Sequence, residues 1–143
     1  MSSQASVWLN KSRRPRLEEG HPWIYANEIA KTEGEPTPGQ LVEVKDHRGQ
    51  LLGTGYWNPA SQITVRLVAY GSLERMDEAF FRNRFERALA HRRRFVGAEQ
   101  SCRLVYGEAD FLPGLVVDRF GGVLVVQVLS LGMETAKEAW LPA

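Results

Sequence analysis

Residues 41–68 read LVEVKDHRGQLLGTGYWNPASQITVRLV, and this stretch decides the fold of the first half of the chain. Leu41–Lys45 and Leu51–Trp57 are β-type runs, joined by a turn in which Gly49 suits a positive φ. Ile63–Val68 alternates apolar residues with a second face, which predicts a half-buried strand; that second face consists of Thr64, Arg66 and Val68. Consecutive strands at this spacing predict a small, partly closed β-barrel.

Shorter signals flank this stretch. Ser6–Asn10 is a candidate first strand. The segment Gly20-His21-Pro22-Trp23 predicts the start of a helix or helical turn, because proline has the fixed φ of a first helical position. Residues 34–39, GEPTPG, predict a loop.

Residues 76–96 give the clearest helix pattern, with Asp77 as N-cap and Gly97 as the stop. An apolar stripe at helical spacing predicts the face that packs inward: Phe81, Phe85, Ala88, Leu89 and Phe95. Arginines cluster on another face. This middle segment is basic and residues 98–143 are acidic, although the net charge of the chain is only +1.

The last third predicts short strands and a final helix. Arg103–Gly107, Leu115–Arg119 and Val123–Leu129 are the strands, the last two joined by a Gly-Gly hairpin signal at residues 121–122. The near-continuous apolar character of the last two implies burial on both faces. A helix begins at about Gly132. A small sheet with one docked helix leaves an open edge, so we expect the chain to be the front part of a longer protein.

Composition excludes several classes. The chain is 43% hydrophobic and 24% charged, as in ordinary globular proteins. No apolar run approaches the roughly 18 residues that a membrane helix needs, and the N-terminus has no signal-peptide core, so we expect a cytoplasmic protein without a membrane partner. The single cysteine, Cys102, and three scattered histidines predict neither a disulfide framework nor a metal site.

No catalytic motif occurs, so no catalytic, cofactor-binding or metal-ligating residue is predicted within the chain. Cys102 is typical of a small core residue. Glu108, Asp110 and Asp118 are typical of solvated turn carboxylates and caps.

The stronger candidates are for RNA, because cations suit phosphates and aromatic rings suit unstacked bases. The predicted RNA-binding residues are Lys11, Arg13, Arg14, Arg16, His21, Trp23, Tyr56, Trp57, Asn58 and Arg66. The basic segment at residues 11–16 is also typical of an ordinary solvated surface. Trp23 and Tyr25 are also typical of core positions. The run at residues 92–94 suits either a phosphate contact or a helix end that favours positive charge.

Five motifs occur in a fixed order: HPWIY at residues 21–25, GYWNPASQITVR at 55–66, FF at 80–81, RLVYGE at 103–108 and LPGLVVDR at 112–119, followed by Gln127. Together they closely resemble the N-terminal portion of bacterial class I methyltransferases that form 5-methylcytosine in 23S ribosomal RNA with S-adenosylmethionine. The resemblance runs from about Trp8 to about Trp140.

The resemblance implies an α+β fold, with a PUA-type β pseudo-barrel at residues 1–73, a connecting helix at 74–97, and the first part of a central α/β hairpin domain at 98–143. It implies ribosomal RNA as the partner. S-adenosylmethionine and the nucleophilic cysteine belong to the family's third domain, so we expect neither in this chain. One position departs from the family, which often has glycine where this chain has Phe111; if the backbone there needs a positive φ, phenylalanine is a poor substitute.

Two other functions stay open. The apolar strand at residues 123–129 could pair between chains, which predicts a homodimer and an architectural or self-association role. The barrel could also be the PUA domain of another RNA-modifying enzyme, such as a pseudouridine synthase, although residues 103–119 argue against that.

Overall fold

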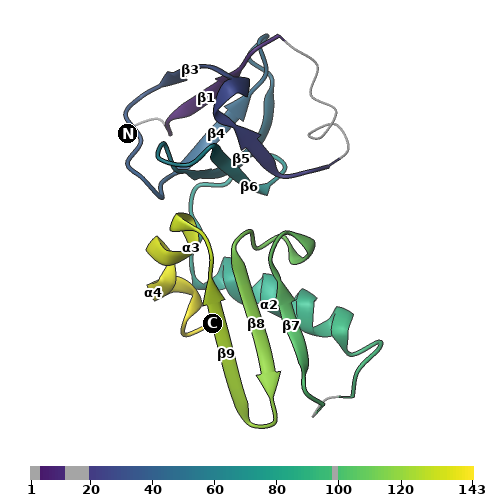
Figure 1. The fold of residues 1–143 in the computed structure, drawn as a ribbon. Helices are drawn as coiled ribbons and strands as arrows, with labels where there is room; N and C mark the ends of the chain where they lie inside the picture. Colours follow the sequence, from purple (N-terminus) through teal and green to yellow (C-terminus); the bar gives the residue numbers. More distant parts are fainter. Residues whose placement is uncertain (1–3, 12–19, 98–99) are drawn as a thin grey trace. The chain divides into compact units, whose positions relative to one another are not determined.

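The computed structural model describes residues 4–11, 20–97 and 100–143 (Figure 1). The chain divides into two compact units, Met1–Arg75 and Met76–Ala143. Within the described residues, no helix is long and apolar enough to cross a membrane.

The first unit is a six-stranded sheet with strand order β2-β6-β5-β4-β1-β3. Its strands are β1 (Ser6–Leu9), β2 (Trp23–Tyr25), β3 (Ile29–Glu33), β4 (Leu41–Lys45), β5 (Leu51–Trp57) and β6 (Ile63–Ala69). A 3-10 turn, η1 (Ala26–Glu28), links β2 to β3. The pairing of β1 with β4 is parallel, and the other neighbouring strands are antiparallel.

The short link between the two outermost strands forces this sheet to curl. In a flat six-stranded sheet, β2 and β3 would lie about 24 Å apart. The chain from Tyr25 to Ile29 can span at most about 14 Å. The two edges are therefore brought toward each other, around a core that includes Val7, Leu9 and Ile24. The predicted α+β class with a partly closed barrel is confirmed.

Strand β2 corrects one sequence prediction. Residues 20–23 do not begin a helix, because this segment takes its hydrogen bonds from β6 instead of from its own next turn. The Leu67 amide donates to the Pro22 carbonyl oxygen at 2.8 Å, and Ile24 is completely buried in the core. Helical geometry starts only at η1.

The prediction that β6 is half-buried is also wrong, because two residues of the face formed by Thr64, Arg66 and Val68 are buried. Thr64 and Val68 are buried along with Val65 and Leu67. The β5–β6 loop folds against Thr64, whose hydroxyl donates to the Ser61 carbonyl oxygen at 3.1 Å. Half-buried Arg66 alone fits the predicted polar face.

Glycines allow β5 to approach β6 closely. A Cβ atom at Gly53 would lie 2.6 Å from the Ala69 carbonyl oxygen, and one at Gly55 would collide with the Arg66 carbonyl group. The strand pairing shifts register between Thr54 and Gly55, at the same place. Gly55 therefore sets the backbone position of Arg66.

The second unit is a three-stranded antiparallel sheet with helices against it (Figure 1). Its elements are α2 (Glu78–Arg92), β7 (Cys102–Tyr106), the 3-10 turn η2 (Gly107–Asp110), β8 (Leu115–Phe120), β9 (Val123–Val128), α3 (Leu131–Thr135) and α4 (Lys137–Trp140). Helix α2 contacts β7, η2 and α4.

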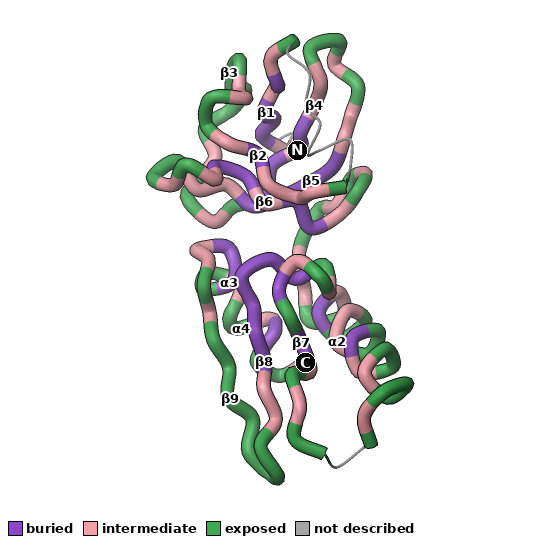
Figure 2. Tube along the Cα trace, turned by 45° about the vertical axis from the view of Figure 1, so that its right-hand side comes forward, coloured by how far each residue is buried: buried purple, intermediate pink, exposed green. Residues whose placement is uncertain are grey.

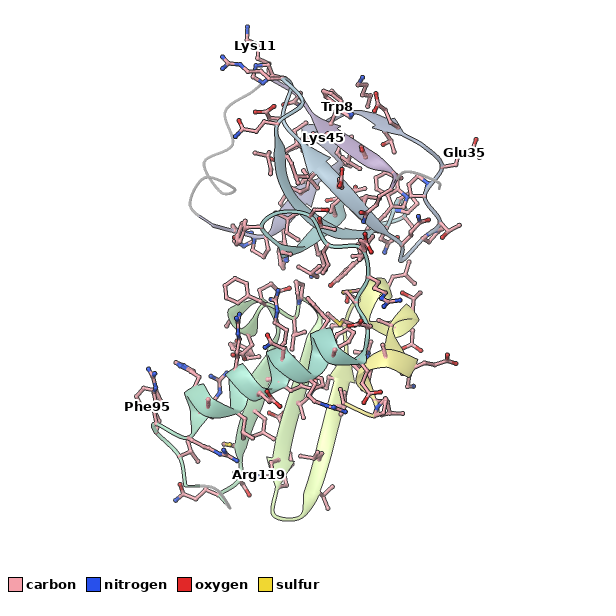
Figure 3. The ribbon with its side chains drawn as sticks, turned by 180° about the vertical axis from the view of Figure 1, so that it is seen from behind. Trp8, Lys11, Glu35, Lys45, Phe95 and Arg119 are labelled. Carbon is pink, nitrogen blue, oxygen red and sulfur yellow. The ribbon has the colours of Figure 1, made fainter. Side chains whose placement is uncertain are left out.

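Helix α2 begins as predicted and ends early. The Asp77 carboxylate accepts a hydrogen bond from the Phe80 amide at 2.9 Å, which confirms the N-cap. Phe81 and Ala88 are buried on the inner face. The chain leaves the helix at Arg93, before the predicted stop, so Phe95 lies in a turn with 77% of its surface exposed and is not part of the packed stripe (Figure 3).

The predicted burial of the last hairpin on both faces is correct for the first half of β8 and wrong for β9. Leu115, Val116 and Val117 of β8 are buried, whereas β9 is exposed from Val123 through Gln127 (Figure 2). Strand β9 forms the outer edge of its sheet, so within the described residues only β8 pairs with it.

One ion pair links β7 to β8, and a second links α2 to η2. The Arg103 guanidinium donates to the Asp118 carboxylate at 2.8 Å, and Arg92 donates to Asp110 at 2.8 Å. The hydrogen bond from Arg103 lowers the pKa of Asp118, partial burial opposes this shift, and the positive charge of Arg103 adds to it.

We predict that Gly55→Ala lowers the free energy of unfolding by about 1–3 kcal/mol, because the added methyl group must displace the β6 backbone. Denaturant unfolding measures this change. Gly122→Ala is the matched control, since a Cβ there meets open space. Equal stability of the two variants would contradict the close approach.

We also predict that Arg103→Gln raises the pKa of Asp118 toward its usual value. The folded-state pKa lies below the unfolded-state pKa, so the pair stabilises the fold above the unfolded-state pKa, and this stability is lost as pH falls through the folded-state pKa. The stability difference between wild type and variant should therefore shrink below about pH 4. Carboxyl NMR titration and denaturation at several pH values measure both effects, and an unchanged Asp118 pKa would contradict the assignment.

Candidate nucleic-acid interface

The ten residues predicted to bind RNA fall into three groups. Arg13, Arg14 and Arg16 lie outside the described residues. Lys11 is exposed and lies two residues after the end of β1 (Figure 3). The other six lie on or beside strands β2, β5 and β6.

Three of these six meet at the edge strand β2. The rings of His21 and Trp23 are 5.0 Å apart in an edge-to-face arrangement, and the Arg66 guanidinium lies 5.0 Å from the Trp23 ring centre. Tyr25 adds a third ring, 6.5 Å from Trp23. We call His21, Trp23, Tyr25 and Arg66 the β2-edge cluster.

Strand geometry explains why these residues share one face. Side chains alternate across a strand, so Trp23 and Tyr25 point away from the core while Ile24 points into it. The pairing of β2 with β6 places Trp23 directly opposite Arg66. Directly opposite residues of an antiparallel pair share a face.

The β2-edge cluster combines two kinds of chemistry. A guanidinium over an indole is favourable by about 0.5–1 kcal/mol at an exposed site, which fixes the orientation of both groups. Trp23, Tyr25 and Arg66 are each half-buried. The Nδ1 atom of His21 is buried and has no hydrogen-bond partner among the described residues. Rings and a cation held in this way suit a base and a phosphate of single-stranded RNA.

Tyr56 is corrected from a stacking residue to a supporting one. It pairs with Arg66 across β5 and β6, so it lies in the same cross-strand row as Trp23 and Arg66. However, only 2% of its surface is exposed. Its ring is therefore not available to a base.

Trp57 and Asn58 also have structural roles. Trp57 is half-buried and packs against the core of the first unit. The Asn58 side-chain oxygen accepts a hydrogen bond from the Ala60 amide at 3.1 Å, which shapes the β5–β6 loop. Asn58 is half-buried too, and RNA contact by either residue stays a prediction.

A second group of rings and cations was not predicted from the sequence. Lys31 and Lys45 place their ammonium groups 4.3 Å and 5.6 Å from the centre of the Trp8 ring (Figure 3). Both lysines are paired with acids, Lys31 with Glu33 at 3.0 Å and Lys45 with Glu43 at 3.8 Å. Only the strand order β4-β1-β3 reveals this group, and its charges are largely balanced.

The Glu33 carboxyl group reports the same balance. Its pKa is lowered by the hydrogen bond from Lys31 and by the positive charges of Lys31 and Lys45, against some desolvation. Because Glu33 keeps its negative charge beside Lys31, the set formed by Trp8, Lys31 and Lys45 is a poor phosphate site.

The acidic candidates and the cysteine have ordinary surroundings. Asp110, at the end of η2, accepts hydrogen bonds from Arg92 and from the Tyr106 amide, and Asp118, within strand β8, accepts from Arg103. Both carboxylates are therefore ion-pair partners, and the prediction of solvated turn carboxylates is wrong for them. Cys102 is half-buried. Over the described ranges, no three His, Cys, Asp or Glu side chains are placed to hold a metal ion.

The chain is similar to known proteins over most of its length. Residues 7–70 match the family model of the PUA-like domain. The chain is 39% identical over 138 residues to the ribosomal RNA large subunit methyltransferase I of Salmonella arizonae, covering 94% of this chain and 34% of that protein. The corresponding Salmonella gallinarum protein is 38% identical over 137 residues, with the same shares.

Solved structures show the same fold. A Streptococcus mutans protein assigned to the SAM-dependent methyltransferases superposes with a TM-score of 0.80 at 14% identity, covering 96% of this chain and 36% of that one. A methyltransferase complexed with SAH gives the same values. The chain spans about a third of the length of the curated relatives it matches. It is thus a relative of the ribosomal RNA large subunit methyltransferases I, with a PUA-like domain at residues 7–70.

Proposed function

We propose that this chain is the RNA-recognition part of an S-adenosylmethionine-dependent ribosomal RNA methyltransferase, and that its first unit binds RNA through the β2-edge cluster. The observation that carries the proposal is Arg66 held over Trp23 within a PUA-like domain. The relatives support ribosomal RNA as the partner, because their name states that substrate.

The basic segment after β1 extends this site in the proposal. Lys11 is exposed, and Arg13, Arg14 and Arg16 follow it in the sequence. Backbone phosphates supply much of the affinity of nucleic-acid complexes, and these cations come shortly before His21 and Trp23 in the sequence. Thus Trp23 would position a base, while Arg66 and the basic segment contact phosphates.

We further propose that the parent enzyme methylates C5 of a cytosine in 23S ribosomal RNA, as the sequence resemblance implies, and that it acts in the cytoplasm. In this proposal residues 1–73 recognise RNA, residues 74–97 connect, and residues 98–143 begin a central domain. Methyl transfer and S-adenosylmethionine binding belong to parts of the parent outside these residues.

Strand β9 favours self-association as a second candidate function. Its exposed apolar side chains, among them Val123 and Leu124, lie on an open sheet edge. Such an edge can pair with a second chain to form a homodimer. Light scattering of the chain with and without RNA separates the candidates, since a dimer that does not bind RNA would favour the architectural role.

We predict that Arg66→Ala weakens binding of a labelled ribosomal RNA stem-loop about tenfold, the effect of losing one charge-assisted phosphate contact of roughly 1.4 kcal/mol. The slope of log affinity against log salt should fall in magnitude by about 0.7–0.9. Fluorescence anisotropy at about 50 and about 200 mM salt measures both values.

Arg48→Ala is the matched control, because Arg48 is an exposed arginine in the β4–β5 turn of the same unit. Cys102→Ala should also leave binding unchanged. Wild-type affinity and salt slope in Arg66→Ala would contradict the β2-edge cluster as the phosphate contact.

We predict that deleting the gene of the parent enzyme removes one 5-methylcytidine from 23S ribosomal RNA. Mass spectrometry of nuclease fragments locates the lost methyl group, and complementation should restore it. Loss of a methyl group at another atom would contradict cytosine C5 while leaving the ribosomal RNA substrate intact.

A further inference from the structure

Phe111 holds a backbone conformation that its side chain disfavours. Its φ is 58° and its ψ is 33°, and among the described residues it is the only one other than glycine with a positive φ. The turn after η2 requires this conformation, because the Phe111 amide donates to the Glu108 carbonyl oxygen at 3.1 Å and the Leu112 amide donates to Gly107 at 3.0 Å. Glycine would adopt it without the steric cost of a Cβ.

Burial of the ring does not compensate for this strain. Phe111 keeps 53% of its surface exposed, whereas Leu112 beside it is completely buried. Core packing therefore does not explain a phenylalanine at this position. Strained backbone that the surrounding structure maintains is found preferentially at binding sites.

Arg84 of α2 holds both the backbone and the ring in place. Its guanidinium donates to the Phe111 carbonyl oxygen at 3.1 Å. The same group lies 4.7 Å from the centre of the Phe80 ring and 5.6 Å from that of Phe111. The exposed ring is thus fixed beside a cation.

A second arginine, Arg87, lies close to Arg84, whereas the nearby Asp110 carboxylate is paired with Arg92. Partial burial lowers the pKa of Arg84, and the charge of Arg87, one helical turn further on, lowers it again. One arginine beside the exposed ring, with a second arginine next to it on the helix, favours a polyanion with flat rings. Any RNA base can stack on such a ring while the phosphates of the RNA backbone contact the cations.

We propose that Phe111, Arg84 and Arg87 form a second RNA contact, on the second unit, where an unpaired base stacks on Phe111 and the adjacent phosphate contacts the arginines. This inference rests on the proposed function, because it takes the same RNA as its ligand. It extends RNA binding beyond the PUA-like domain to the unit that begins at Met76.

The test compares variants of the 143-residue chain for binding to a labelled RNA stem-loop with an unpaired loop. Phe111→Gly should bind about tenfold more weakly, within the range for loss of one base–aromatic stack. Its Tm should stay within about 4 °C of wild type, because relief of strain offsets the lost ring contacts. Phe111→Tyr, which keeps a ring, should bind like wild type.

Phe120→Leu is the matched control, since Phe120 is equally exposed, at 58%, and has an extended strand backbone. It should leave RNA affinity unchanged. Phe111→Gly with wild-type affinity would overturn the inference. A fall in Tm well beyond about 4 °C that accompanies the loss of binding would also overturn it, because the ring would then be structural.

The failure of this inference is distinguishable from failure of the proposed function. Binding that is lost in Arg66→Ala and kept in Phe111→Gly would overturn only the second contact. The reverse pattern would overturn the β2-edge cluster and support Phe111. A wild-type chain that does not bind the stem-loop would overturn both.

Discussion

The backbone pairing of β2 with β6 is the constraint on which the candidate RNA site depends. It places Trp23 opposite Arg66 and Ile24 in the core, so the same hydrogen bonds that join β2 to the sheet also assemble the cluster. The close approach of β5, allowed by Gly55, positions the Arg66 backbone from the other side. Trp23, Tyr25 and Arg66 of this site therefore lie on paired strands of the sheet. A preorganised ring and cation lose little conformational entropy when RNA binds.

Local sequence signals such as caps and turns predict much of this fold. The features that the sequence does not predict depend on contacts between residues far apart in the chain. The N-cap at Asp77 and the Gly-Gly hairpin were predicted because their chemistry involves only near neighbours. The segment at Pro22 was mistaken for a helix because its hydrogen-bond partners lie on β6, far along the chain. The exposure of β9 also could not be predicted, since apolar composition does not say whether another element covers a strand.

The candidate site follows the same division. Residue types alone indicated Trp23 and Arg66, but only strand register shows that they touch and that Tyr56, in the same row, is buried. The Trp8 group was missed because its lysines come from two other strands. Phe111 is the instructive case. The sequence indicated that phenylalanine is unsuitable at this position if φ is positive, and the structure confirms a positive φ. The exposed Phe111 ring beside Arg84 is the basis for the proposed second RNA contact.

The most direct test of RNA binding at the β2 edge is the proton–nitrogen NMR spectrum of the chain during titration with an RNA stem-loop. The four tryptophans give four separate indole signals. The Trp23 indole and the Arg66 side-chain signal should shift together. The Trp140 indole, which is buried and donates to the Met133 carbonyl oxygen, should stay in place. RNA binding that leaves the Trp23 and Arg66 signals unmoved would contradict the assignment of the site to this edge.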